Sequence, residues 1–213
     1  LGYATKQTCY VSNVCSVIAD KAGTEEGLRI VVAHIDSVGA HKAGADDNAS
    51  GTAALLEMAR VLAKVESGQA LRFFIANGEE DGLLGSKHYV RQLVQSGEIE
   101  KISMVINMDM VGYNKNGIVE LETNAPFKNL AQHFAELAAS YTTLKSKITI
   151  GAWGSDHVPF LEEDVPALLT LEDWDTKTPC YHAECDKPDT LNYDYAAQIT
   201  KLNVAAIMTS SAK

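Results

Sequence analysis

No long apolar run occurs in this sequence, and neither does an internal repeat, a low-complexity segment or a linker rich in proline, glycine or serine. A membrane-spanning helix needs about 20 consecutive apolar residues, so we expect no transmembrane segment. Because 46% of the 213 residues are hydrophobic, the chain can bury one core. We therefore predict a single domain over residues 1–213.

Positive charge is scarce as well. The chain has 18 Lys and Arg against 28 Asp and Glu, which gives a formal net charge of −10 at pH 7. A surface this acidic repels nucleic acid and anionic membranes, so we expect neither as a partner. Carboxylates gathered around a bound cation also count as excess negative charge until the cation is included. Part of the acidity can therefore belong to a metal site.

The four cysteines are few but even in number, at Cys9, Cys15, Cys180 and Cys185. An even count favours an oxidising compartment, so we expect a secreted or periplasmic protein. Cys180 and Cys185 are close enough to close a small loop, and we expect them to pair. Cys9 and Cys15 can pair across a tight hairpin, but on one extended strand they would lie about 20 Å apart and could not.

Apolar β-branched segments alternate with segments of helical periodicity along the chain. Buried strands are predicted at 28–33, 71–76, 103–108 and 118–121, and shorter strands at 147–150 and 167–171. Helices are predicted at 49–65, 83–95, 127–139 and 193–208. Segment 9–19 is expected to form one strand that turns back toward Leu28. The alternation predicts an α/β fold with a mixed, mostly parallel central sheet flanked by helices on both faces.

Acidic and imidazole side chains follow three of these strands. His34 and Asp36 follow the first, Glu79 and Glu80 the second, and Asp109 the third. In sheets of this kind the site forms beyond the carboxyl ends of the strands, so these side chains are expected at one rim. His34 and Asp36 point the same way in an extended segment. The Asp36 carboxylate is therefore expected to accept the second ring N–H of His34.

Two adjacent acid pairs and a late histidine complete the possible ligands. Asp46 and Asp47 precede the helix at 49–65, which Asn48 or Ser50 can cap, Glu79 and Glu80 lie in a glycine-flanked loop, and His182 lies in a late loop. Each feature alone is ordinary, because acids commonly cap helices or lie in solvated loops. Together they would repel one another unless a cation neutralised them. His, Asp and Glu donors suit zinc, so the sequence predicts a metal site.

Six ordered motifs carry a resemblance to a known family: HIDS, GADDNASG, NGEEDGLLGSKHY, NMDMVGY, SDHVPF and YHAECDKPDT. In this order they resemble the M28 family of zinc aminopeptidases, in particular bacterial secreted aminopeptidases of the leucyl type. The resemblance runs from about Leu28 to the C-terminus. It implies the zinc exopeptidase fold, with residues 1–213 forming a single zinc peptidase catalytic domain.

The resemblance also implies two zinc ions per chain and a role for each matching residue. His34 and Asp109 bind one zinc ion, Glu80 and His182 bind the other, Asp47 bridges the two, Glu79 is the general base, and Asp36 orients His34. It further implies a cis peptide bond between Asp47 and Asn48.

The function implied is removal of the N-terminal residue from peptides or proteins. A water held between the zinc ions would lose its proton to Glu79, which would pass it to the leaving amine. Tyr181 is a candidate donor to the developing oxyanion, although ordinary packing explains its position equally well. Met110, Trp153 and Phe160 are candidates for a side-chain pocket, although apolar residues near a rim are more often core. We expect a monomer.

Three other functions compete with this interpretation. A glutaminyl cyclase resembles the same fold, but works with one zinc ion and catalyses an intramolecular acyl transfer. A carboxypeptidase of related fold needs a cationic pocket, and no arginine cluster lies near the motifs. A non-catalytic binding module, such as the transferrin receptor ectodomain, would have lost ligands. His41, His88, His133 and His157 receive no ligand role.

Overall fold

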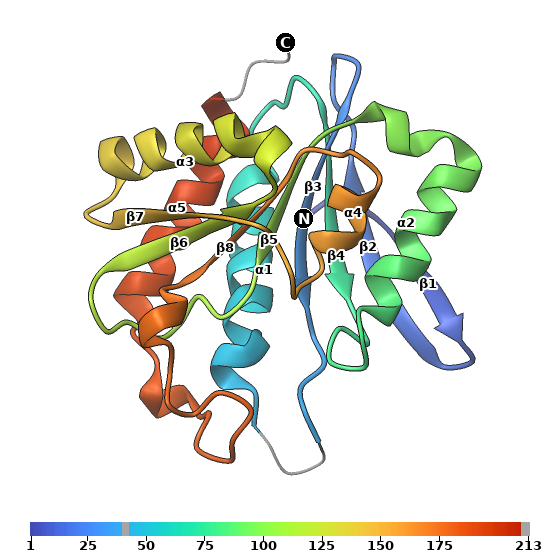
Figure 1. Cartoon of the computed structure of the whole chain (residues 1–213). Helices are drawn as coiled ribbons and strands as arrows, with labels where there is room; N and C mark the ends of the chain where they lie inside the picture. Colours follow the sequence, from blue (N-terminus) through green and yellow to red (C-terminus); the bar gives the residue numbers. More distant parts are fainter. Residues whose placement is uncertain (40–42, 210–213) are drawn as a thin grey trace.

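The computed structural model describes residues 1–39 and 43–209, so His41 lies outside the described residues. Its centre is an eight-stranded mixed sheet in the order β1-β2-β4-β3-β5-β8-β6-β7 (Figure 1). The pairs β3–β4, β3–β5, β5–β8 and β6–β7 are parallel, whereas β1–β2, β2–β4 and β6–β8 are antiparallel. The strands are β1 Ala4–Val11, β2 Val14–Lys21, β3 Leu28–His34, β4 Ala70–Ala76, β5 Ile102–Met108, β6 Ile118–Thr123, β7 Lys145–Ile150 and β8 Ala167–Glu172.

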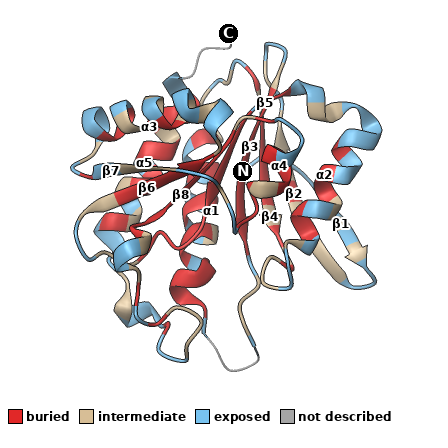
Figure 2. Ribbon diagram, viewed as in Figure 1, coloured by how far each residue is buried: buried red, intermediate tan, exposed pale blue. Residues whose placement is uncertain are grey.

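Helices cover both faces of this sheet. The helices are α1 Gly51–Leu62, α2 Leu84–Ser96, α3 Lys128–Tyr141, α4 Val158–Glu162 and α5 Tyr193–Thr209. Helices α1, α3 and α5 bury their apolar sides against one face, and Figure 2 shows the buried residues between the layers. Helices α2 and α4 form a second core on the other face. The predicted α/β fold with a mixed, mostly parallel sheet is therefore confirmed.

The second core does not reach the whole sheet. It includes side chains of β2, β3, β4, β5 and β8, but among the described residues none from β6 or β7. The same face of β6 and β7 therefore has no helix packed on it in this core.

The N-terminal hairpin differs from its prediction. Segment 9–19 was expected to be one strand, but β1 and β2 form an antiparallel hairpin that turns at Ser12 and Asn13. Asn13 has a φ of 70°, a conformation that asparagine tolerates better than most residues. The turn brings Cys9 opposite Cys15, and the two form a disulfide. The sequence leaves the pairing of Cys9 with Cys15 open, whereas it predicts the Cys180–Cys185 disulfide, which is also present.

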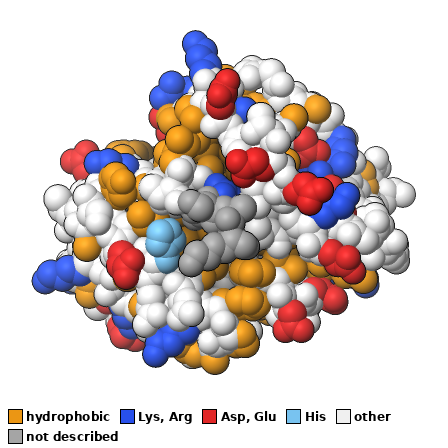
Figure 3. All heavy atoms as spheres, turned by 90° about the horizontal axis from the view of Figure 1, so that it is seen from above, with side chains coloured by type: hydrophobic (Ala, Val, Ile, Leu, Met, Phe, Trp, Pro, Cys, Tyr) orange, Lys and Arg blue, Asp and Glu red, His pale blue; other side chains and the backbone are white. Residues whose placement is uncertain are grey.

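Helix α4 is the other element that the periodicity did not predict, because its five residues are too few to show a helical pattern. Within the described ranges, none of the helices has the length and apolarity that crossing a membrane requires. Seen from above, the basic and acidic side chains are interspersed over the surface in Figure 3.

Candidate active site

The first donor cluster lies at the ends of two central strands. His34 is the last residue of β3, and Asp109 directly follows β5. The Nε2 atom of the buried His34 ring lies 3.3 Å from Asp109 Oδ1 and 3.3 Å from Asp47 Oδ1. Burial lowers the pKa of His34, but Asp109 and Asp47 outweigh burial and place this pKa well above its usual value. The Ser155 hydroxyl donates to Asp109 Oδ2 over 2.7 Å and orients that carboxylate.

The second ring nitrogen of His34 is held by backbone. Nδ1 lies 3.0 Å from the carbonyl oxygen of Asp36, and because a carbonyl only accepts, Nδ1 is the donor. The prediction that the Asp36 carboxylate accepts this N–H is wrong, since its Oδ1 lies 3.8 Å from Nδ1. The carboxylate accepts the backbone N–H groups of Glu79 and Glu80 instead, at 3.2 and 3.0 Å. Asp36 thus joins the β3 end to the loop after β4.

The second donor cluster lies on loops. His182 Nε2 lies 3.1 Å from Glu80 Oε2 and 3.0 Å from Asp47 Oδ2. The other oxygen of Glu80, Oε1, is buried without a hydrogen-bond partner among the described residues. Burial, and then the charge of Asp47, raise the pKa of Glu80 to about 8. His182 lies in the loop that the Cys180–Cys185 disulfide closes.

Asp47 belongs to both clusters. Its Oδ1 faces His34 and its Oδ2 faces His182. The carboxylate of Asp186 holds the loop by accepting the backbone N–H groups of Asp46 and Asp47, at 2.8 and 3.0 Å. The peptide bond between Asp47 and Asn48 is cis, as the resemblance implied.

The start of α1 fits closely against the end of β5. Asn48 Nδ2 donates to the Met108 carbonyl over 2.9 Å, and Asn48 Oδ1 accepts the Gly51 N–H over 2.9 Å. Asn48, rather than Ser50, therefore satisfies a free N–H at the start of the helix. A Cβ on Gly51 would lie 2.3 Å from the Met108 carbonyl oxygen, so only glycine fits there.

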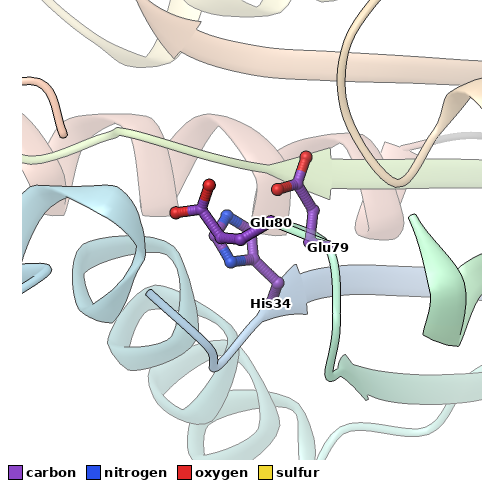
Figure 4. Close-up of side chains that lie close together, drawn as sticks. All are labelled: His34, Glu79 and Glu80. Carbon is purple, nitrogen blue, oxygen red and sulfur yellow. The ribbon is translucent and has the colours of Figure 1, made fainter. Parts of the chain in front are cut away.

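Glu79 and Glu80 leave their loop in different directions. The loop begins at Gly78, whose φ of 84° favours glycine. Figure 4 shows the two side chains leaving the loop in different directions, with Glu80 beside the His34 ring, although one oxygen of each carboxylate lies within 4.8 Å of the other and of a His34 ring nitrogen. Burial, and then the charge of Asp109, raise the pKa of Glu79 to about 9. Neighbouring residues can therefore serve different parts of one site.

A cavity of about 320 Å³ opens beside these donors. Of the three predicted pocket residues, Met110 and Trp153 line this cavity, but Phe160 does not. Phe160 is fully buried in the core under α2 and α4, where its ring packs edge-on against Tyr89 at 6.3 Å. The prediction of Phe160 as a pocket residue is wrong, because α4 turns this side chain toward the sheet.

Tyr181 lies between the cavity and the second donor cluster. Its ring stacks on His182 at 3.8 Å between centroids and meets Trp174 edge-on at 5.3 Å. Burial, and then the charge of Asp47, raise the pKa of the Tyr181 hydroxyl, so this group keeps its proton at neutral pH. A protonated phenol that lines the cavity is available as a hydrogen-bond donor.

Several residues of the site escaped prediction. Asp186 lies inside a quoted motif, yet only the fold shows that it holds the Asp47 loop. Glu120 and Glu122 line the cavity from β6. The alternation of these glutamates with Val119 and Leu121 could have identified them, because polar residues at every second position of a strand lie on one face.

The donor set can be tested against a metal ion. Three groups of side chains place ligand atoms within 4.8 Å of one another: His34, Asp47 and Asp109; Asp47, Glu80 and His182; and His34, Glu79 and Glu80. Imidazole and carboxylate donors in this number fit zinc. The partnerless, buried Glu80 Oε1 agrees with this fit, because a buried carboxylate oxygen needs a donor or a cation.

Comparison with known proteins shows the family to which this chain belongs. The model of peptidase family M28 matches residues 13–207. Aminopeptidase YwaD of Bacillus subtilis is 34% identical over 208 residues, which cover 95% of this chain and 45% of that protein. The chain therefore spans about half the length of the curated relatives it matches.

Solved structures agree with the sequence match. The LapA aminopeptidase of Legionella pneumophila superposes with a TM-score of 0.90 at 25% identity, covering 99% of this chain and 59% of that chain. BSAP, a zinc aminopeptidase from Bacillus subtilis, superposes with a TM-score of 0.81 at 33% identity, covering 91% of this chain and 49% of that chain. Since the family model spans nearly the whole sequence, the chain belongs to peptidase family M28.

Proposed function

We propose that this chain is a zinc-dependent aminopeptidase that hydrolyses the N-terminal residue of peptides. The observation that carries the proposal is the sharing of Asp47 between two donor clusters, each with its own imidazole. Zinc would be held by His34, Asp47 and Asp109 on one side and by Asp47, Glu80 and His182 on the other. The YwaD, LapA and BSAP proteins that the chain resembles are named as aminopeptidases, which supports the same reaction class.

Two bound zinc ions would polarise the scissile carbonyl and lower the pKa of a water to about 7. Glu79 belongs to neither cluster that contains Asp47, so its carboxylate is free for proton transfer. We assign Glu79 as the general base that takes the proton of the attacking water and gives it to the leaving amine. The protonated Tyr181 hydroxyl would donate to the oxyanion that develops on the carbonyl.

Selection of a free N-terminus follows from charge. The carboxylates of Glu79, Glu80 and Asp109 line the cavity where it meets the donor clusters. A protonated α-amine is attracted to such a site, whereas a C-terminal carboxylate is repelled. Among the described residues lining the cavity, the basic side chains other than His182 are limited to Lys147, which three carboxylates already surround. This arrangement argues against a carboxypeptidase.

The remaining alternatives differ in metal content and chemistry. A glutaminyl cyclase would use a single zinc ion, and a binding module would have lost donors. All five donors, His34, Asp47, Glu80, Asp109 and His182, are present and converge. Zinc analysis of dialysed protein tests the first alternative, because two zinc ions per active chain are expected for the hydrolase and one for the cyclase.

A panel of aminoacyl-arylamides tests the proposal directly. We expect hydrolysis that is lost with a chelator and restored by zinc. The matched control is an N-acetylated aminoacyl-arylamide, which lacks the cationic amine and should not be cleaved. Cleavage of the blocked substrate at an equal rate would contradict the assignment as an exopeptidase, and inactivity on the whole panel with zinc present would contradict the proposed function.

The biological setting is part of the same proposal. Peptide or protein N-termini are the expected substrates, and we propose that the chain acts as a monomer. Two disulfides among the described residues are typical of proteins that fold in an oxidising compartment. We therefore propose a secreted or periplasmic location, which disulfide mapping together with fractionation of the producing cells would test.

A further inference from the structure

The cavity beside the metal donors lies on the face of β6 and β7 that the second core leaves uncovered, and it extends to Leu169 and Leu171 in the later part of β8. Strand β6 alternates here, so that Val119 and Leu121 enter the core while Glu120 and Glu122 line the cavity. The strand register creates two cross-strand rows on the cavity side. Glu120 pairs with Leu171 and Lys147, whereas Glu122 pairs with Leu169 and Thr149.

Both carboxylate oxygens of Glu120 accept hydrogen bonds from other residues of the chain. Its Oε2 accepts from Lys147 Nζ over 3.0 Å and from the Trp174 backbone N–H over 2.9 Å. Its Oε1 accepts from the Thr149 hydroxyl. Lys147 also donates to Asp173 and Asp175, at 3.0 and 2.8 Å. These contacts fix both Glu120 and Lys147 within the protein.

Glu122 differs from Glu120 although it lies two residues away on the same face. It is only 5% exposed and lines the cavity, yet within the described part of the chain its side chain accepts no hydrogen bond. Thr149, its neighbour on β7, gives its hydroxyl to Glu120 instead. Among the described residues its close basic neighbour is the buried His157, whose Nε2 lies 3.3 Å from Oε1, within ion-pair distance but without a hydrogen bond. A buried carboxylate in this position favours a cationic ligand.

The walls of the cavity suit the stem of a long side chain. Met110, Leu169 and Leu171 supply apolar surface between the metal donors and the β6 glutamates, and Trp153 and Trp174 add aromatic rings. Lysine and arginine have this combination of an apolar stem and a charged head. Beyond the metal donors and Glu79, the described lining residues hold three carboxylates, Glu120, Glu122 and Asp175, against the single ammonium of Lys147.

We propose that this cavity binds the side chain of an N-terminal lysine or arginine, with the Glu122 carboxylate receiving its cationic head. This inference rests on the proposed aminopeptidase function and names its substrate class. It assigns Glu122 as a specificity residue, because an extra charge-assisted hydrogen bond separates a basic side chain from a neutral one of the same length.

Lysyl- and norleucyl-arylamide form the sharpest pair of substrates, because they share an unbranched stem and differ in the ammonium group. We expect kcat/KM of the wild-type, zinc-loaded chain to favour the lysyl substrate by about tenfold at low salt. Raising the salt concentration should reduce this preference, since salt screens the attraction. Neither measurement depends on the folding of a variant.

The variant Glu122→Gln keeps the shape of the side chain and removes its charge. We expect it to lower the ratio of lysyl to norleucyl kcat/KM by about tenfold. The matched control is Glu136→Gln on α3, outside the cavity, which should leave the ratio unchanged. An unchanged ratio in Glu122→Gln, with wild-type preference intact, would overturn the assignment of Glu122.

A binding measurement complements the kinetics. Both tryptophans of the chain, Trp153 and Trp174, line this cavity, so intrinsic fluorescence reports its occupancy. L-lysinamide should bind about tenfold more tightly than L-norleucinamide to the wild type, and about equally to Glu122→Gln. Equal binding and equal hydrolysis of the lysyl and norleucyl compounds by the wild type would overturn the inference alone. Failure to cleave any arylamide would overturn the proposed function and the inference with it.

Discussion

The two donor clusters that share Asp47 are built in different ways. His34 and Asp109 extend from the ends of central strands, and the side chain of His34 is only 1% exposed. Glu80 and His182 stand on loops, and the His182 side chain is 34% exposed. The strand cluster takes its geometry from a hydrogen-bonded ladder, whereas the loop cluster depends on individual tethers.

Those tethers are specific contacts rather than regular structure. The Asp36 carboxylate binds two N–H groups of the Glu79–Glu80 loop, and a disulfide closes the loop that carries His182. Asp186, in turn, holds the Asp47 loop. At a strand end the ladder fixes the backbone and side-chain contacts only orient the ligand, whereas a loop depends on such contacts for the position of its backbone as well. The two clusters should therefore respond differently to the same kind of substitution.

The largest effect is expected where the clusters join. Asp47→Asn keeps the shape of the side chain but removes the charge that both clusters share. We expect bound zinc to fall in both, and kcat/KM on the preferred arylamide to fall by at least about a thousandfold. Metal analysis after dialysis checks the first expectation. Retention of both zinc ions with normal activity would show that Asp47 is not shared.

Glu79→Gln separates chemistry from metal binding. The general base is lost, so we expect kcat to fall by about 10²–10⁴. Zinc content should stay near that of the wild type, because Glu79 lies outside the clusters that contain Asp47. Asp47→Asn serves as the matched comparison, since it should lose both rate and metal. Substantial activity in Glu79→Gln would contradict the base assignment.

The strand cluster was largely predictable from sequence, whereas in the loop cluster only the position of Glu80, which follows a predicted strand, was predictable. An apolar β-branched run ends at His34, and strand ends of a parallel sheet share a rim, so the meeting of His34 with Asp109 followed from pattern alone. Nothing local places His182, whose role came only from resemblance. The Asp36 prediction failed because backbone amides of a distant loop competed for its carboxylate. Phe160 failed because a five-residue helix leaves no periodic signal.

In zinc-free protein the two histidines should differ in their effect on stability. His34→Ala leaves Asp47 and Asp109 buried without their cationic partner, which costs about 3 kcal/mol of unfolding free energy. His182→Ala removes a pair that solvent screens, which costs less than about 1 kcal/mol. With a chelator present, Tm should therefore fall by about 10 °C and by less than about 4 °C, respectively. Equal falls in Tm for the two variants would show that the two clusters contribute equally to the stability of the zinc-free protein.

Removal of each disulfide in turn gives a matched pair of variants, for which we expect smaller effects than for His34→Ala. Replacing Cys180 and Cys185 by serine frees the loop of His182, so we expect about a tenfold loss of kcat/KM and weaker binding of zinc. The same change at Cys9 and Cys15 affects the hairpin of β1 and β2, which contacts Asn77 before the Glu79–Glu80 loop but carries no metal donor, so it should lower kcat/KM less. Each pair should cost about 2 kcal/mol of stability, since the loops have similar length. Equal kinetic effects would show that the loop of His182 needs no such tether.

The last expected effect concerns the support of the loop cluster and its dependence on pH. Glu172 Oε1 accepts the Thr178 N–H over 2.7 Å, while Oε2 is buried without a partner among the described residues. Burial, and then the charge of Asp46, raise the pKa of Glu172 to about 9. The folded state therefore holds an extra proton, and the stability from this group is present below about pH 4.5 and is lost as pH rises toward 9.

Glu172→Gln keeps the acceptor and does not ionise, so its Tm relative to wild type should rise across this range, by roughly 2–4 °C for each kcal/mol. A constant difference in Tm between pH 5 and pH 9 would show that Glu172 ionises as easily in the folded chain as in the unfolded one.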